Sequence, residues 1–489
     1  MQSIFRKINL FLLIIIAKYA ILAIFTLNNC YFWDAIQQVS KEGHWFYLTN
    51  FSSLLIPENN SLNISATGYH PPLMGMMTAL LWKIFGLELY VSHAFTAFWA
   101  ILLIYNSWEL ISSLFPKKYA GWALLIVLLE PSILTQFAIA SPDFILFTAF
   151  VISLRAVIER KPFLLGIGIF FLCCINMRGV FVGIMLFFAN IYFDYLQSNK
   201  KYSLKSFGQT LLPYLPTLLV LISYFIYYFS QKGWFFANSG GNEHYEMPQN
   251  LQTIIAHFLS FVLRCVENGR FVIWILAFFF LFILIKKKRK LSSVEKTLGI
   301  FVLLLNGLYF LFIFISQMPF SARYFSPQFF ALTILVLLFI VKYFDFKKIR
   351  IFFAVILVFT LSGHFWMYPE KMAKAWDATL AHLPYYELRN DCFKYIDEND
   401  FDYKDLAAGF CLSGDRSFIE LSHNGGVVGG IDMNKPYFIY SNISNLEDEY
   451  IDELKDTSKW KPVKTVRKYP VFITIYQNLL HPNSKGIKQ

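Results

Sequence analysis

The stretch GYHPPLMGMM, residues 68–77, places a histidine and two prolines in a chain that is otherwise rich in Leu, Ile and Phe. Proline has no backbone N–H and breaks a helix interior, so this stretch cannot lie in the middle of an ordinary membrane-spanning helix. The apolar segment that follows, Leu73–Phe85, has only about 13 residues, whereas a span needs about 20. We therefore predict that Leu73–Phe85 forms a short helix lying along the membrane surface.

The composition of the whole chain is that of a membrane protein. Of its 489 residues, 56% are hydrophobic, and the mean hydropathy is +0.49. Several apolar runs reach about 20 residues, the length of a helix that crosses the hydrocarbon core of a bilayer. A soluble domain of this length would not need so much apolar surface, so the sequence predicts an all-α polytopic membrane protein.

The net charge of +11 has a distribution that argues against a nucleic-acid partner. The basic residues lie in short clusters between apolar runs, as the positive-inside rule predicts for cytoplasmic loops. The clusters are Arg6–Lys7, Lys117–Lys118, Arg160–Lys161, Lys200–Lys201, Lys286–Lys290 and Lys347–Arg350. The positive charge therefore indicates the orientation of the spans in the membrane.

Placing every basic cluster on one side gives about eleven spans, with a cytoplasmic N-terminus and an outer C-terminus. The first span is predicted at about 8–27 and is retained, because no small-x-small cleavage site follows it. Outer loops are predicted at about 28–70 and 230–270. Further spans are predicted at about 89–114, 119–139, 209–229, 294–315 and 351–368, with the remaining spans between them. Residues 1–368 would then form one transmembrane domain.

The tail, residues 369–489, is predicted to be a small α/β domain outside the cytoplasm. Eighteen of the 32 acidic residues follow residue 368, which marks a change to a polar composition. The pattern predicts helices at 385–398 and 448–456 and strands at 435–440, 461–466 and 471–478. The tail also holds Cys392 and Cys411, which could form a disulfide outside the cytoplasm or remain free.

Charged or titratable groups gather at the predicted outer ends of the spans. They come from separate places in the sequence, and polar groups at this depth are costly and tend to be functional. They are Asp34, His70, Asp143, Arg178, Arg264, Arg270 and Arg323. We therefore expect them to converge on one site at the outer membrane surface.

Each of these groups also has a purely structural interpretation. Asp34 could mark the polar end of the first span, and Asp143 could cap the helix that follows it. His70 could cap the short helix after the two prolines, and the arginines could bind lipid headgroups. Inside the spans, Lys18 and Glu130 are expected to form a structural ion pair.

A lipid phosphate at the outer surface would use both kinds of charged group. The planar guanidinium of an arginine offers paired, charged hydrogen bonds to phosphate oxygens. A carboxylate beside them could take a proton from an incoming hydroxyl group. One acid and several arginines on the same face therefore suit group transfer from a lipid phosphate.

Four features resemble the GT-C membrane glycosyltransferases. They are the acid Asp34 in the first outer loop, HPPL (70–73) before an interfacial helix, the segment from Pro131 to Asp143, and RYFSP (323–327). The branch is that of the protein O-mannosyltransferases and the lipid A aminoarabinose transferases. HPPL with the loop acid is the specific signal, whereas RYFSP is weak. The resemblance covers the first four spans by motif and the rest by topology.

The resemblance implies an inverting enzyme that uses a polyprenyl-phosphate-linked sugar on the periplasmic face of a bacterial inner membrane. Asp34 would be the catalytic base. Many members have Asp-Glu here, but this chain has Asp34–Ala35, so the second acid is absent or supplied elsewhere, for example by Asp143. Members of the family differ in metal use, so no cofactor is certain and a divalent metal stays open.

The predicted substrate contacts follow from the same resemblance and from the outer positions of the arginines. Arg178 and Arg323 are expected to hold the donor phosphate. The acceptor is a glycolipid, a glycan or a protein. The predicted substrate-binding side chains are Tyr69, His70, Arg178, Arg264, Arg270, Arg323 and Tyr324.

Two other classes of polytopic protein compete with this interpretation. A lipid-linked sugar flippase or an O-antigen polymerase would also carry outer-face arginines, but it would not need the early acid with HPPL or a large outer tail. A secondary transporter is less consistent with the sequence, because the chain shows no internal repeat and few charges within its spans.

Overall fold

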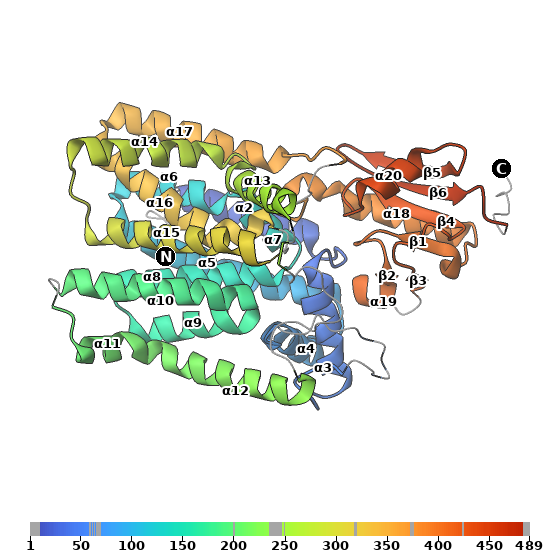
Figure 1. The fold of residues 1–489 in the computed structure, drawn as a ribbon, viewed down its shortest axis with the longest axis horizontal. Coiled ribbons are helices and arrows are strands. Elements are labelled where there is room, and N and C mark those ends of the chain that lie inside the picture. The colour runs from blue at the N-terminus through green and yellow to red at the C-terminus, as the bar shows by residue number, and fades with distance from the viewer. Residues whose placement is uncertain are drawn as a thin grey trace, which may run out of the picture.

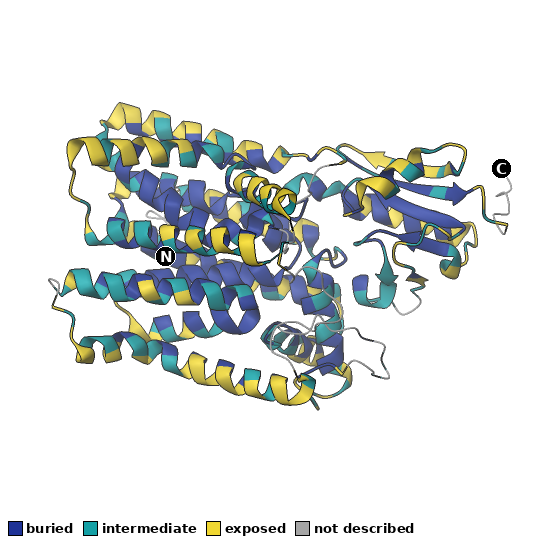
Figure 2. Cartoon of the chain, in the orientation of Figure 1, coloured by how far each residue is buried: buried dark blue, intermediate teal, exposed yellow. Residues whose placement is uncertain are grey.

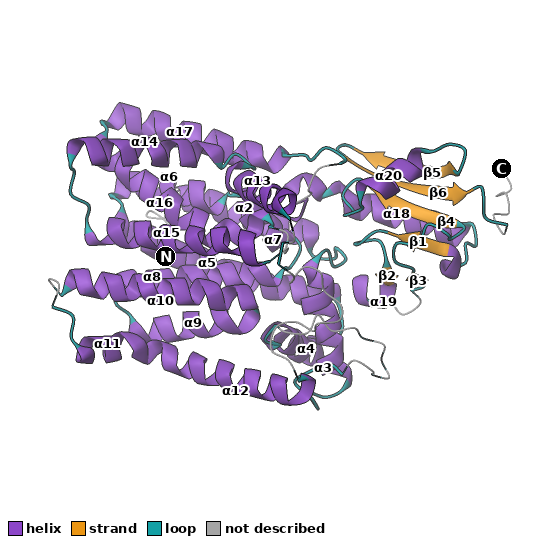
Figure 3. Cartoon of the chain, in the orientation of Figure 1, coloured by secondary structure: helices purple, strands orange, loops and turns teal. Residues whose placement is uncertain are grey.

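The computed structural model of the chain describes residues 10–57, 60, 62, 64, 70–198, 201–233, 247–248, 250–316, 320–371, 376–422 and 425–482. A helical body and a smaller region with all the drawn strands lie end to end (Figure 1 and Figure 3). The all-α membrane body with a C-terminal α/β region that we predict is therefore confirmed.

The helical body is built from helices that follow the apolar runs of the sequence. α4 (Leu73–Phe85) and α5 (Leu89–Leu114) begin and end at the predicted residues. The other helices are α2 (Leu10–Thr26), α3 (Glu42–Leu48), α6 (Lys117–Leu128), α7 (Pro131–Ala138), α8 (Pro142–Glu159), α9 (Pro162–Ile175), α10 (Met177–Gln197), α11 (Leu204–Leu211), α12 (Leu215–Lys232), α13 (Leu251–Val266), α14 (Phe271–Lys287), α15 (Ser293–Ile315), α16 (Ser326–Tyr343) and α17 (Phe346–Ser362).

The exposed apolar surface of this body faces lipid. Figure 2 shows that α8 and α16 are buried at its centre, whereas α12, α14 and α17 carry many exposed positions. Exposed side chains on the outer helices include Leu219, Ile226, Phe278 and Phe282. Such continuous apolar faces are unfavourable in water but match the hydrocarbon core of a membrane. The chain is therefore an integral membrane protein.

Among the described residues, six helices or continuous helix runs are long and apolar enough to cross a membrane, or up to eight if each of two bent pairs is one span. The bent pairs are α6 with α7, at 59°, and α13 with α14, at 91°. α2, α4 and α9 are apolar but shorter. The count of about eleven spans stays a prediction, as does the side of the membrane on which each terminus lies.

Three predicted segments differ from the structure. The loop predicted at 28–70 contains a π-helix, η1 (Ile36–Lys41), and α3, and the loop predicted at 230–270 contains α13. The span predicted at 119–139 is broken at Glu130, whose carboxylate accepts a hydrogen bond from the Ile133 N–H at 3.0 Å. Glu130 is therefore the N-cap of α7, with Pro131 at its first position, where proline is favoured.

The C-terminal region contains a four-stranded sheet in the order β1-β4-β6-β5. β1 (Leu406–Ala408) pairs in parallel with β4 (Tyr437–Ser441), and the other pairings, with β6 (Val471–Asn478) and β5 (Trp460–Lys468), are antiparallel. α18 (Pro384–Glu398) and α20 (Asp448–Lys455) match the predicted helices, and β4, β5 and β6 match the predicted strands. A short pair, β2 (Gly414–Asp415) and β3 (Val427–Val428), flanks α19 (Arg416–Ile419).

Two further features concern the tail. Cys392 and Cys411 are both buried as free thiols, so the disulfide that we considered between them is not formed. The short helix η6 (Trp376–Ala378) follows the predicted boundary at residue 368 but packs against α7, where the Gln136 Nε2 donates to the Asp377 carbonyl at 2.5 Å. The boundary between the two domains therefore stays a prediction.

Candidate active site

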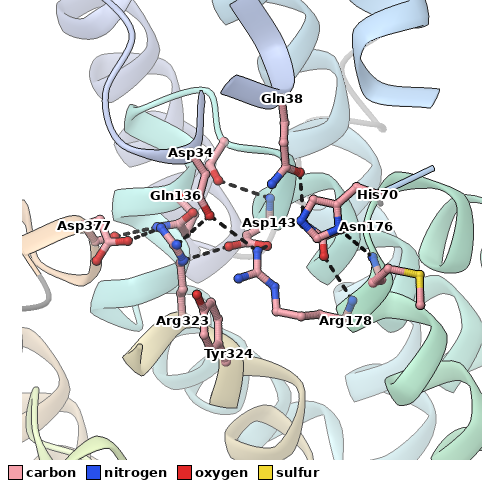
Figure 4. Close-up of polar contacts among 12 residues, drawn as sticks. Asp34, Gln38, His70, Gln136, Asp143, Asn176, Arg178, Arg323, Tyr324 and Asp377 are labelled. Carbon is pink, nitrogen blue, oxygen red and sulfur yellow. Dashed lines mark hydrogen bonds and ion pairs between the residues drawn. The ribbon is translucent and has the colours of Figure 1, made fainter. Parts of the chain in front are cut away.

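Three carboxylates and two guanidinium groups meet at the end of the helical body that faces the C-terminal region (Figure 4). Asp34 follows α2, Asp143 lies in the first turn of α8, and Arg178 lies in the first turn of α10. Arg323 lies in the short helix η4 (Ala322–Phe325) and Asp377 in η6. Five segments that are far apart in the sequence therefore supply one cluster of charges.

Arg323 is the centre of this cluster. Its Nη2 contacts the Asp34 Oδ2 at 2.6 Å, its Nε contacts the Asp143 Oδ2 at 2.9 Å, and its Nη1 donates to the Asp377 Oδ2. The Arg323 side chain is only 5% exposed. Two of its nitrogens therefore donate hydrogen bonds to carboxylates of the protein itself, and the third lies close to Asp143 without a hydrogen bond.

Arg178 is the more accessible of the two arginines. Its Nη2 lies 2.5 Å from the Asp143 Oδ1 and 3.7 Å from the Asp34 Oδ2. The guanidinium lies 4.0 Å from the centre of the Tyr324 ring, within the range of a cation–π interaction. The side chain of Arg178 is 17% exposed. Asp143 and the Tyr324 ring therefore hold the guanidinium of Arg178 in place, while part of the side chain remains accessible.

Exposure distinguishes the three acids. The side chain of Asp34 is 31% exposed, whereas those of Asp143 and Asp377 are 7% and 5% exposed. Asp34 is therefore the one of these three acids whose carboxylate a ligand could reach most easily. Asp143 is buried in contact with Arg178 and Arg323, and Asp377 is buried in contact with Arg323.

The surroundings change the affinity of these groups for protons. Burial raises the pKa of Asp34, but the adjacent Arg323 and Arg178 outweigh it and hold the pKa below its usual value. Burial raises the pKa of Asp377, and Arg323 offsets this only in part. Burial, with the nearby Arg178, lowers the pKa of His70 to about 3. At neutral pH, Asp34 is therefore ionised and His70 is neutral.

Local backbone structure positions two of the acids. Trp33, immediately before Asp34, has φ 49°, and Ala140, three residues before Asp143, has φ 51°. Non-glycine residues seldom adopt this left-handed conformation, and such strain clusters at functional sites. The Ser141 hydroxyl accepts a hydrogen bond from the Asp143 N–H at 3.1 Å. Ser141 is therefore the N-cap of α8, and the Asp143 carboxylate is left to pair with the arginines.

The C-terminal region holds the segment that carries Asp34. The Tyr31 N–H donates to the Ile419 carbonyl at 2.8 Å, and the Ser40 hydroxyl donates to the Phe418 carbonyl at 2.5 Å. The Phe32 ring stacks on His382, with centroids 5.0 Å apart. These contacts lie on both sides of Asp34 in the sequence, so the C-terminal region is part of what orients it.

His70 lies beside the start of α10. Its Nδ1 accepts a hydrogen bond from the Met177 N–H at 3.4 Å, and its carbonyl accepts one from the Tyr224 hydroxyl at 2.8 Å. The structure thus brings His70 to the cluster, as predicted, and Tyr324 lies against Arg178. Their role in substrate binding stays a prediction. Tyr69, the other predicted contact from this stretch, lies outside the described residues.

The structure does not bring Arg264 and Arg270 to this cluster. Both side chains are buried. Arg264 donates to Glu267 at 2.7 Å and to the Phe320 carbonyl at 2.9 Å, and Arg270 contacts Glu130 at 2.7 Å. These arginines neutralise buried acids, which favours a structural role for both, and their role in substrate binding stays a prediction. The partner of Glu130 is Arg270 and not Lys18, as we had expected.

Replacing Arg270 should therefore affect stability before it affects binding. Arg270→Met leaves Glu130 buried without its cation, and breaking a buried pair in this way costs about 3–5 kcal/mol. We expect a lower midpoint of thermal unfolding in detergent, and recovery of most of the loss in the double variant Arg270→Met with Glu130→Gln. If the Arg270→Met variant had normal stability and a raised KM for the substrate, Arg270 would contribute to substrate binding.

Sequence analysis missed four polar residues of the site. Asp377 lies in the acid-rich tail, where nothing distinguishes it except that it stands alone in the apolar run AWDATLAHL, residues 375–383. Asn176 caps α10 by accepting from the Arg178 N–H at 3.0 Å, and its Nδ2 donates to the Gln38 Oε1 at 2.9 Å. Gln136 donates a hydrogen bond to the Asp377 carbonyl. The side-chain amides of Asn176, Gln38 and Gln136 therefore help to fix the segments that carry the charged groups.

The resemblance leaves a divalent metal open, and the described side chains show no site for one. Among them, no group of three or more His, Cys, Asp and Glu side chains is arranged to hold a metal ion. Asp34, Asp143 and Asp377 are directed at the guanidinium of Arg323 instead.

Comparison with known proteins supports the fold. No family model and no curated protein matches the sequence. Two solved structures of ArnT from Cupriavidus metallidurans, one bound to undecaprenyl phosphate and one in the apo state, each match with a TM-score of 0.51 at 12% identity, over 95% of this chain and 97% of that chain. The chain therefore has the fold of these ArnT structures, which agrees with the fold that the resemblance implied.

Proposed function

We propose that this protein is an inverting glycosyltransferase that moves a sugar from a polyprenyl-phosphate-linked donor to an acceptor at the outer face of a bacterial cell membrane. The main support is the contact between an accessible carboxylate, Asp34, and a partly accessible guanidinium, Arg178. The likeness of the fold to ArnT is consistent with this proposal. The ArnT structure bound to undecaprenyl phosphate supports a lipid of this class as the donor carrier. The acceptor is a glycolipid, a glycan or a protein.

In the proposed reaction, Asp34 takes the proton of the acceptor hydroxyl as its oxygen attacks the anomeric carbon. The bond from that carbon to the phosphate oxygen breaks on the opposite face, so the configuration inverts and the polyprenyl phosphate leaves as an anion. Arg178 stabilises the phosphate charge as it develops. No general acid is required, because the leaving phosphate is stable without a proton.

We had expected both arginines to hold the phosphate, but their contacts favour different roles for Arg178 and Arg323. Arg323 is directed at three protein carboxylates, so we assign it to positioning Asp34. Arg178 is more exposed and is the better candidate for the phosphate. Asp143, which contacts both guanidiniums, would hold them and not act as a second base.

The Arg178→Ala variant tests the phosphate assignment. Loss of one charged hydrogen-bond partner costs about 1.5–3 kcal/mol, so kcat/KM for the donor should fall about 10- to 100-fold. Arg178→Lys should recover only part of this, because the paired geometry of the guanidinium is lost. The matched control is Arg467→Ala, which removes an exposed arginine of β5 and should transfer normally. Normal donor turnover by Arg178→Ala would place the phosphate elsewhere.

The overall function is tested in cells by mass spectrometry of lipids and surface glycans from a deletion strain. A glycosyltransferase predicts that a polyprenyl-phosphate sugar accumulates while one glycan residue is lost, and Asp34→Asn should fail to restore it. If the purified protein moves lipid-linked sugars across vesicles without consuming them, the enzyme assignment is wrong.

A further inference from the structure

A second polar site lies at the opposite end of the helical body. An open cavity of about 430 Å³ is lined by the end of α8, the start of α9, the end of α10 and one face of α11. α8 carries Asp143 at its first turn and ends beside this cavity, and its 18 residues span about 27 Å at 1.5 Å per residue. The cavity is therefore separate from the Asp34 cluster and has no part in the reaction proposed above.

Hydroxyl and amide groups line this cavity. Tyr202 donates to the Thr210 hydroxyl at 2.8 Å, and Thr210 donates to the Asp194 carboxylate at 2.7 Å. This chain of hydrogen bonds satisfies part of the only acid in the lining. The polar lining residues include Gln197, Ser198, Tyr202, Ser206, Gln209 and Thr210. A ligand with several hydroxyl groups would find donors and acceptors here.

Two cationic side chains complete the lining. Arg160 has φ 55° and forms the left-handed C-cap of α8, so the chain reverses there and brings Arg160 and Lys161 to the cavity. Their side chains remain 56% and 49% exposed. Arg160 forms one ion pair with Asp194, at 3.5 Å. Lys161 forms an ion pair with Glu159, which also pairs with Arg155. The exposed lysines Lys201 and Lys205 flank the lining, so the charge favours an anion.

Exposed apolar side chains lie next to the lining residues in the sequence. Phe163 and Leu204 are 83% and 87% exposed, and each lies one or two residues from a lining residue, Pro162 and Ser206 respectively. Leu212, next to the lining residue Pro213, is also exposed. Strongly exposed apolar groups beside a polar, cationic cavity at the end of membrane helices are typical of the boundary between acyl chains and headgroups.

We propose that this cavity binds the headgroup of an anionic, hydroxyl-bearing phospholipid. Arg160 and Lys161 contact the lipid phosphate, the side chains of α10 and α11 bind the headgroup hydroxyls, and the acyl chains lie on Phe163 and Leu204. Arginine and lysine both bind phosphate, and basic residues at a membrane surface gain about 1 kcal/mol each from anionic lipid. The proposal does not depend on the reaction at the other end of the helices.

Native mass spectrometry of the full chain, released from detergent micelles, tests whether Arg160 and Lys161 bind the lipid phosphate. The probes are dioleoylphosphatidylglycerol and, for comparison, dioleoylphosphatidylcholine. We expect the double variant Arg160→Gln with Lys161→Gln to bind phosphatidylglycerol about tenfold or more weakly, since two basic contacts are lost. The matched control, Lys347→Gln with Lys348→Gln, removes two basic residues from the start of α17 and should bind normally. An equal loss in both pairs would show general attraction to basic loops and overturn the site.

A second variant tests the cavity without changing the charge. Ser206→Leu with Gln209→Leu replaces polar lining by apolar side chains, and it should weaken phosphatidylglycerol binding while gel filtration shows an unchanged monodisperse protein. Wild-type binding by this variant would overturn the assignment of the headgroup to the cavity. Soluble glycerol phosphate, added at the lipid concentration, should not displace the lipid. Displacement by it would identify a soluble phosphate ester, and not a lipid, as the ligand.

Discussion

Asp34→Asn should lose about 10²- to 10⁴-fold of sugar transfer, the range that general base catalysis supplies. The amide keeps the shape of the side chain but cannot take the acceptor proton. The pKa of Asp34 is held below its usual value by the two arginines, so the wild-type carboxylate is ionised throughout the neutral range. The measurement is in-vitro transfer by purified variants with a lipid-linked sugar.

The controls for Asp34 separate base catalysis from folding. Asp34→Glu should retain little activity, because a displacement of about 1 Å can cost about 10²-fold. Asp391→Asn removes an exposed acid of α18 and should transfer normally. Donor binding by Asp34→Asn should be kept. Wild-type transfer by this variant would remove Asp34 as the base, and Asp143 would become the candidate.

Arg323→Gln should affect both stability and transfer. It leaves Asp34, Asp143 and Asp377 without the cation that they share, and removing one partner of a buried charge pair costs about 3–5 kcal/mol. We expect a lower unfolding midpoint and a loss of transfer larger than that of Arg178→Ala. Arg323→Lys should recover only part of either, since a single ammonium cannot reach three carboxylates with the guanidinium geometry.

A double variant distinguishes the two effects of Arg323. Arg323→Gln with Asp377→Asn removes one cation and one buried acid, so much of the stability should return. Transfer should stay low, because Asp34 still lacks the group that orients it. If transfer returns together with stability, Arg323 has only a structural role, and the orientation of Asp34 depends on its own backbone and the C-terminal region.

The sequence predicted those parts of the fold that depend on local patterns. The bounds of α4 and α5 were correct because apolar runs there end at residues that stop a helix, such as Gly86 and Pro116. The π-helix η1 was missed because its sequence, IQQVSK, is mostly polar and was assigned to a loop. The break at Glu130 was missed because the residues on both sides of it are apolar. α13 was assigned to a loop because polar residues interrupt its apolar face. β1 has three residues, too few for a periodic pattern.

The candidate site was predicted in part. Asp34, Asp143, Arg178 and Arg323 do meet, because the segments that carry them end on the same side of the helical body. Arg264 and Arg270 have the same position in the sequence pattern, and only the fold shows that their partners are the buried Glu267 and Glu130. Asp377 was missed because its approach to Arg323 depends on how the tail packs against α7, which no local pattern records.

The order of the five charged segments along the chain has a consequence for biosynthesis. A ribosome delivers Asp34 first and Asp377 last, and the carbonyls of Phe418 and Ile419 that hold the Asp34 segment follow later still. The segment that carries Asp34 therefore gains all of its contacts only when the chain has been synthesised beyond Ile419. A chain that ends before Phe418 lacks these contacts, so any function of the charged cluster that depends on them requires nearly the whole C-terminal region.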